Sequence, residues 1–108
     1  MAESAPHGRE DFAERSAKLL SAMANAKRVA ILIVLQSGEF SVGSLSEMVG
    51  LNQSALSQHL AKLRHARLVT TRRDAQTVYY SSASHPVAKV LATLEEIAGA
   101  SIKMPRAA

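Results

Sequence analysis

The chain contains no cysteine and no tryptophan among its 108 residues. The lack of cysteine excludes disulfide bonds, Cys-ligated zinc and thiol redox switching, and it suits a reducing compartment. No apolar run approaches the roughly 20 residues of a membrane-spanning helix. The N-terminus also lacks the basic and apolar segments of a signal peptide. We therefore expect a cytoplasmic protein without membrane association.

Acidic residues are missing from the middle of the chain. Between Met48 and Arg73 there is no Asp or Glu, although the formal net charge of the whole chain is only +4. The same segment carries five basic residues, which are Lys62, Arg64, Arg67, Arg72 and Arg73. A segment with only basic charges, between two ends that carry both signs of charge, is typical of a surface that binds nucleic-acid phosphates. The alternative is a basic face that only contacts solvent.

Length and composition indicate a single domain. The 108 residues, 47% of them hydrophobic, can bury a small core. The periodic segments extend over residues 10–99, so we expect the domain there. Residues 1–9 and 100–108 have the composition of flexible tails.

The most informative stretch is Leu51 to Arg67. Leu56, Leu60 and Leu63 recur with helical spacing and lie on one face, after Asn52 as N-cap. The opposite face is small or hydrogen-bonding and lacks acids; it holds Ser54, Ser57, Gln58, Ala61, Lys62 and His65. This pattern predicts the recognition helix of a winged helix-turn-helix that binds duplex DNA.

The segments around this helix complete that fold. We expect helices over 10–24, 41–49 and from Pro86 onward, with Ser41 or Ser44 capping the short one and Gly50 ending it. Residues 27–36 are apolar almost all round and fit a buried strand or helix; their length, alanine content and Asn25 favour the helix. The predicted fold is mainly α with a small β-hairpin, and the two helix-turn-helix helices precede the hairpin.

The hairpin, or wing, is predicted from a change of period. Residues 68–73 and 77–82 alternate and are rich in β-branched and aromatic side chains. The intervening 74–76 segment lacks the glycine of the tightest turns, so we expect three or more loop residues.

The place of each residue in the predicted fold suggests its contact with DNA. The 53–66 helix should enter the major groove, where glutamine and serine can bond base edges and cations hold phosphates. His59, at the rim of the core face, either donates to a phosphate or supports packing. The wing tip should reach the backbone or the minor groove. The expected DNA-binding residues are Gln53, Ser54, Ser57, Gln58, His59, Lys62, Arg64, Arg72, Arg73 and Gln76.

The first and last helices carry apolar stripes outside the helix-turn-helix. We expect them to pair with their copies in a homodimer, because two reader helices one helical turn apart can read a pseudo-palindromic operator. The alternative is that both stripes cover the core of one protomer. The expected interface residues are Phe12, Leu19, Leu20, Val87, Val90, Leu91 and Leu94.

Four segments resemble the ArsR/SmtB family of bacterial repressors: LSAMANAKR (20–28), EFSVGSL (39–45), QSALSQHLAKLR (53–64) and LVTTRRDAQTVYY (68–80). Within it they are most similar to the branch of NolR-type and BigR/HlyU-type regulators. The resemblance covers about residues 15–98. It implies a homodimeric winged helix-turn-helix that binds operator DNA, usually represses, and dimerises through its first and last helices.

The chain departs from the family's known sensors. Ser41-Val42-Gly43 stands where metal sensors carry Cys-x-Cys, and the last helix offers His85, Glu95 and Glu96 without a second histidine. Ile33 and Gly99 match the positions of the two cysteines of thiol-sensing members. We therefore expect no cofactor, no metal and no obvious small-molecule ligand.

Three alternatives stay open or are set aside. A ligand-responsive repressor would need an unrecognised site, for which His7, Asp11 and Glu14 could meet His85 or Glu95 across the dimer. An acidic or apolar exposed face over residues 54–65 would favour a protein-interaction module, but this face is neither acidic nor apolar. No nucleophile–base pair, phosphate loop or ligand cluster indicates an enzyme.

Overall fold

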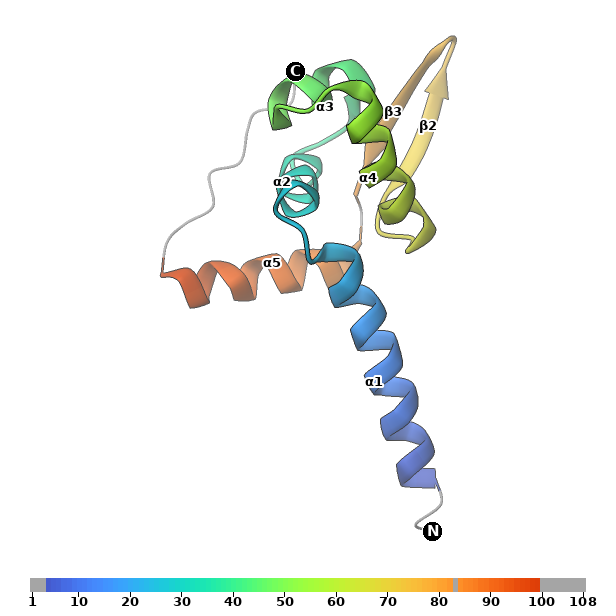
Figure 1. Ribbon diagram of the computed structural model, residues 1–108, viewed down its shortest axis with the longest axis vertical. Helices are drawn as coiled ribbons and strands as arrows, with labels where there is room; N and C mark the ends of the chain where they lie inside the picture. The colour runs from blue at the N-terminus through green and yellow to red at the C-terminus, as the bar shows by residue number, and fades with distance from the viewer. Residues whose placement is uncertain (1–3, 83, 100–108) are drawn as a thin grey trace.

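The computed structural model describes residues 4–82 and 84–99, which form a helical body with a projecting hairpin (Figure 1). The mainly helical winged fold is confirmed. Within the described part of the chain, no helix is both long and apolar enough to cross a membrane. In chain order the elements are α1 (Ser4–Met23), α2 (Ala26–Leu35), β1 (Phe40–Ser41), α3 (Val42–Val49), α4 (Gln53–His65), β2 (Thr70–Asp74), β3 (Thr77–Ser81) and α5 (His85–Ala98).

Local capping fixes where the helices begin. The Asn25 side chain accepts from the first backbone N–H groups of α2, and Asn52 accepts from the N–H of Ala55 at 2.8 Å. Ser41 rather than Ser44 caps α3. These bonds satisfy N–H groups that have no partner within the helix. The ambiguous 27–36 segment is therefore a helix, as its Asn25 cap indicated.

Gly50 ends α3 and begins the turn to α4. Its φ of 70° lies in the left-handed region, which glycine enters without steric cost. The backbone N–H of Gly50 bonds to the carbonyl of Ser46 at 3.0 Å. Only the short segment Leu51–Asn52 then separates the turn from α4, so the two helices form the predicted unit.

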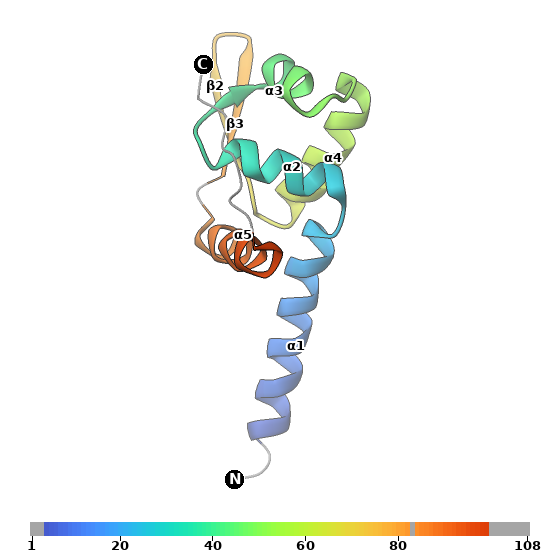
Figure 2. The same cartoon turned by 90° about the vertical axis from the view of Figure 1, so that its left-hand side faces the viewer.

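The core lies around α2, which Figure 2 shows between the α3–α4 pair and α5. Leu56, Leu60 and Leu63 of α4 are at most 1% exposed. The buried side chains they join are Ile31, Leu32 and Leu35 of α2, Leu45 of α3, Leu68 after α4, and Val87 of α5. Burial of this stripe forces the opposite face of α4 outward.

A third strand, β1, was not predicted. Phe40 pairs with Tyr80 and Ser41 with Tyr79, which gives an antiparallel sheet in the order β1-β3-β2. A two-residue strand has no measurable period, so sequence patterning could not reveal it. Its pairing ties the wing to the start of α3.

The wing loop is shorter than expected. Asp74 pairs with Thr77, so only Ala75 and Gln76 form the loop, and the expectation of three or more loop residues is wrong. Ala75 makes this possible by taking a φ of 58°. This conformation costs a non-glycine residue about 1–2 kcal/mol, which the strand pairing offsets.

The end of α4 is also strained. Arg67 follows the helix with a φ of 63°, in a position that usually holds glycine. The N–H of Leu68 bonds to the carbonyl of Leu63 at 2.9 Å, and the N–H of Arg67 bonds to Arg64 at 2.9 Å. Both bonds belong to the Schellman arrangement, which reverses the chain into the wing.

The N-terminal helix is longer than predicted. α1 begins at Ser4, so a flexible tail over residues 1–9 is wrong from residue 4 onward. The expected tail at 100–108 lies outside the described residues. Figure 1 shows that α1 projects away from the body, at the end opposite the wing.

The predicted dimer stripe divides into two sets. Val87 and Leu91 are 0% and 5% exposed because they pack in the core of their own protomer, so their assignment to an interface is wrong. Leu19 and Val90 are half-buried against the same core. The large side chains left exposed on α1 and α5 are Phe12, Leu20, Leu94 and Ile97. Ile97 belongs to the apolar stripe of the last helix but is not among the residues expected at the interface.

Candidate nucleic-acid interface

The exposed face of α4 is the centre of the interface. Its first two turns present Gln53, Ser54, Ser57 and Gln58 to solvent, above the buried leucines. Exposed Lys62 and Arg64 follow in the last turn. Cations in the last turn also complement the helix dipole, so their position serves the helix as well as a bound phosphate. No acidic side chain lies on α4.

Lys27 holds the α3 end of the reader unit. Its Nζ donates to the carbonyl of Val49 at 2.8 Å, where α3 ends. A cation at this end satisfies a free carbonyl and the helix dipole together. Lys27 therefore has a structural role in the reader unit.

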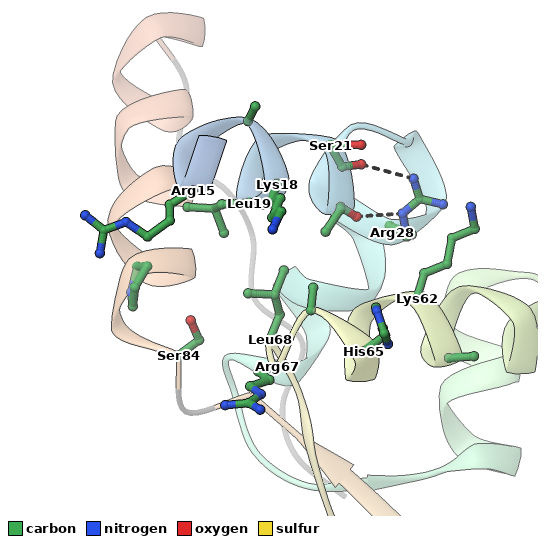
Figure 3. Close-up of a pocket in the computed structure, with 15 residues that line it drawn as sticks. Arg15, Lys18, Leu19, Ser21, Arg28, Lys62, His65, Arg67, Leu68 and Ser84 are labelled. Atoms are coloured by element: carbon green, nitrogen blue, oxygen red, sulfur yellow. Dashed lines mark hydrogen bonds between the residues drawn. The ribbon is translucent and has the colours of Figure 1, made fainter. Parts of the chain in front are cut away.

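Arg28 performs the same task for α1 and also contacts α4 (Figure 3). Its Nε donates to the carbonyl of Ala22 at 2.6 Å and its Nη2 to Ser21 at 3.4 Å. Its Nη1 lies 3.3 Å from Nδ1 of His59. A guanidinium only donates, so Nδ1 of His59 accepts and the imidazole is neutral. Of the two roles left open for His59, the structure supports packing.

Stability should therefore depend on the charge of His59. Burial lowers its pKa from 6.5, and the nearby Arg28 and Lys62 lower it further. As the pH is lowered through about 6.5, His59 binds a proton more readily in the unfolded chain than in the folded chain. The free energy of unfolding therefore decreases as the pH is lowered. We expect the urea concentration at the midpoint of unfolding to decrease when the pH is lowered from 7.5 to 5.5, and to decrease less in His59→Gln. Equal pH dependence of the two proteins would contradict this assignment.

Arg72 is engaged within the wing. Its Nη2 lies 2.9 Å from Oε1 of Glu39 and its Nε 3.0 Å from Oε2, while the guanidinium lies 4.8 Å from the centre of the Tyr79 ring. The hydrogen bond from Arg72 lowers the pKa of Glu39, so the carboxylate stays charged. Arg72 therefore holds the wing to the β1 segment, and its expected contact with DNA stays a prediction. Glu39 was not selected from the sequence, because only the pairing of β1 with β3 brings it next to Arg72.

Arg73 and Gln76 remain available at the wing. Both are exposed, and neither has an ion pair or side-chain hydrogen bond in the described part of the chain. Arg73 pairs with Val78 in register, on the face opposite Arg72, because successive residues of a strand alternate. This is the face on which Tyr80 packs against the core. Figure 1 shows the hairpin extending beyond α3 beside α4.

Among the residues considered for a metal site, His7 has a side chain that lies outside the described part of the chain. Over the described residues, no three His, Asp or Glu side chains lie close enough to hold an ion. The ligands suggested from α1 and α5 would come from two protomers, and that shared site stays a hypothesis.

The amino-acid sequence is similar to those of known regulatory proteins. Residues 25–71 match the model of "Bacterial regulatory protein, arsR family". Nodulation protein NolR of Rhizobium meliloti is 58% identical over 94 residues, which cover 87% of this chain and 77% of the relative. Transcriptional activator HlyU of Vibrio cholerae is 47% identical over 96 residues, covering 86% and 89%.

Solved structures agree with these matches. The crystal structure of NolR from Sinorhizobium fredii is similar with a TM-score of 0.83 and 57% identity, covering 87% of this chain and 94% of that one. The homodimeric winged helix-turn-helix DNA-binding domain of Mb0332 from Mycobacterium bovis has a TM-score of 0.75 and 30% identity, with 84% of each chain covered.

Proposed function

The chain belongs to the ArsR family of bacterial regulatory proteins, and from this premise we propose that it is a homodimeric repressor that reads a pseudo-palindromic operator. It is a DNA-binding transcriptional regulator of the winged helix-turn-helix type. The observation that supports the operator proposal is the α4 face, where exposed Gln and Ser lie above buried leucines. A dimer seated on such an operator represses by excluding other proteins from the same DNA.

Base reading is assigned to the first half of α4. Gln58 can bond the N6 and N7 atoms of adenine together, whereas Ser54 and Ser57 can donate to or accept from several base edges. Gln53 lies at the start of α4, where the backbone N–H groups favour phosphate. Lys62 and Arg64 contact phosphates, which fixes the register without reading sequence.

The wing adds a second backbone contact through Arg73, with Gln76 at its tip. Arg73→Ala should weaken binding to every duplex several-fold and reduce the slope of log K against log salt by about 1, because one fewer counterion is released. Binding titrations over a salt series measure both effects. Lys89→Ala is the matched control for lost charge, since Lys89 is an exposed cation of α5, outside α4 and the wing. An unchanged slope in Arg73→Ala would remove this residue from the phosphate contacts.

Regulation cannot use a thiol of this chain, because it has no cysteine. We assign no cofactor, and the zinc site shared by His and carboxylate side chains of α1 and α5 is the alternative. The operator of a bacterial regulator lies in the cytoplasm, and we place the protein there.

The proposed function is tested by binding to labelled duplexes from the region upstream of its own gene. Two conditions are compared over a salt series, one with zinc and one with EDTA. We expect nanomolar affinity that falls steeply with salt and does not change with zinc. Loss of binding with zinc would establish the alternative metal-responsive repressor. No binding to any duplex at low salt would overturn the proposal in favour of a protein-interaction module.

A further inference from the structure

The junction between α1 and the rest of the protomer is small. Among the described side chains of α1, residues 9–23, only that of Met23 is buried, at 4% exposed. α1 has 20 residues, so at 1.5 Å per residue it is about 30 Å long. Figure 1 shows that it meets the body only near its C-terminal end. A small change of angle at this end therefore displaces the whole helix.

A cleft lies between α1, the second half of α4 and the start of α5 (Figure 3). It has a volume of about 1390 Å³ and opens to solvent. Lys18 and Leu19 line it from α1, and Ala61 and His65 line it from α4. Because the space between these side chains is open, close packing does not fix the angle between the two helices there. The angle depends on the few contacts at the end of α1.

Arg28 spans this junction with its guanidinium. Its Nε donates to the carbonyl of Ala22 at 2.6 Å and its Nη2 to that of Ser21 at 3.4 Å, both in the last turn of α1. Its Nη1 lies 3.3 Å from Nδ1 of His59, in the second turn of α4. A guanidinium is planar and rigid, so its donors hold their partners in fixed relative positions. Arg28 therefore connects the end of α1 to the reader helix.

The contact of Arg28 reaches the half of α4 that is assigned to base reading. His59 is flanked in sequence by Gln58, an assigned base reader, and by Leu60, which is 1% exposed. Leu60 fixes the helix in the core, whereas the contact with His59 fixes this turn relative to α1. α1 carries the exposed Leu20, which is assigned to the pairing surface. Arg28 thus lies between the pairing surface and the reading surface.

Lys27 provides a comparison at the same helix start. Its Nζ donates to the carbonyl of Val49 at 2.8 Å, where α3 ends. Both neighbouring cations therefore bind a carbonyl at the end of a helix. Lys27 connects α2 to α3 within the reader unit, whereas Arg28 joins α1 to α4.

We propose that Arg28 is a positioning residue, which through Ala22 and His59 sets the angle between α1 and α4 and thereby the half-site spacing that the dimer accepts. This inference rests on the proposed function. In a two-fold dimer joined through α1, the angle at each junction determines the distance and rotation between the two reader helices. One base pair changes the separation of two half-sites by about 3.4 Å and their rotation by about 34°. A fixed angle therefore favours one spacing over the next.

The first test measures the separation of the reader helices without DNA. The chain has no cysteine, so Ser57→Cys allows one spin label per protomer at an exposed position of α4, about 160° around the helix from His59. Pulsed electron paramagnetic resonance gives the distribution of distances between the two labels. We expect Arg28→Met to broaden this distribution and Lys27→Met, the matched loss of a bound cation, to leave it narrow. No broadening in Arg28→Met, or equal broadening in both variants, would overturn the proposal.

The second test compares three duplexes derived from the operator: two half-sites at the natural spacing, two half-sites one base pair further apart, and a single half-site. The unmodified protein should prefer the natural to the longer spacing about tenfold. Arg28→Met should bind the natural spacing about fivefold more weakly, bind the single half-site unchanged, and prefer the natural spacing only about twofold. An equal loss on the single half-site would mean that Arg28 shapes the reading surface itself, and it would overturn the proposal.

Two variants of His59 separate positioning from stability. His59→Leu removes the acceptor and should reduce the preference for spacing as much as Arg28→Met, with no further loss in the double variant. His59→Asn supplies an amide oxygen as acceptor near the position of Nδ1 and should retain the preference. A contact that only stabilises the fold would change the urea midpoint in these variants and leave the preference for spacing intact. That result, or equal losses in His59→Leu and His59→Asn, would overturn the proposal.

Failure of this inference is distinguishable from failure of the proposed function. If the unmodified protein is a monomer or binds no duplex, the proposed function fails and the positioning role of Arg28 fails with it. If the protein binds its operator as a dimer and Arg28→Met keeps the full preference for spacing, only the positioning role fails.

Discussion

Leu20→Glu is expected to convert the dimer to a monomer and to weaken operator binding by about two orders of magnitude. Leu20 is 54% exposed on α1, near the end of an apolar side that also includes the 66% exposed Phe12. Burying a carboxylate in a pairing surface requires its desolvation without a partner cation. A monomer retains one reader helix and loses the gain from binding two half-sites at once.

Light scattering measures the mass of the variant, and fluorescence anisotropy measures its affinity for a duplex with two half-sites. Ala92→Glu is the matched control, because it adds the same charge at an exposed position of α5 about 160° from Leu94. The control should remain dimeric. A dimeric Leu20→Glu protein that still binds with full affinity would move the interface away from this side of α1.

Gln58→Ala is expected to cost about 1–3 kcal/mol on the preferred half-site and to relax base preference at one position. Gln58 is exposed in the second turn of α4, and its helix is anchored by Leu56 and Leu60 beneath it. The amide can form two bonds with adenine that no other base pair offers in that pattern. The lost affinity therefore depends on the base that the side chain meets.

Competition among duplexes substituted at each half-site position measures this preference directly. Arg64→Ala is the control, because an exposed cation assigned to phosphate should weaken binding uniformly over all sequences. If Gln58→Ala also reduces affinity by the same factor on every duplex, Gln58 contacts the backbone and another residue of the α4 face reads the base.

The roles of the basic residues could be predicted only in part from the sequence. It identified the basic, acid-free segment that contains α4 and the wing, and the structure exposes nearly all of the selected side chains there. It did not separate cations that serve the fold from cations free to bind. Lys27 and Arg28 each bind carbonyls at the end of another helix, and Arg72 binds Glu39. These partners are distant in sequence, so no local pattern indicates them.

The sequence by itself determined the order of the helices and most of their ends, because these depend on local interactions. Asn25, Asn52 and Gly50 act within a few residues of their own positions, and helical periodicity alone assigned the leucines of α4 to the core. The same local signals predicted the helix-turn-helix and include the segments that resemble the family.

Tertiary structure alone decided which apolar residues remain for a partner and where the cleft lies. Val87 and Leu94 belong to one stripe of α5, yet only Val87 reaches the core of its own protomer. The cleft likewise combines α1, α4 and α5, which meet only after folding. Burial and enclosure depend on distant segments packing together, and a linear pattern records only the face on which each side chain lies.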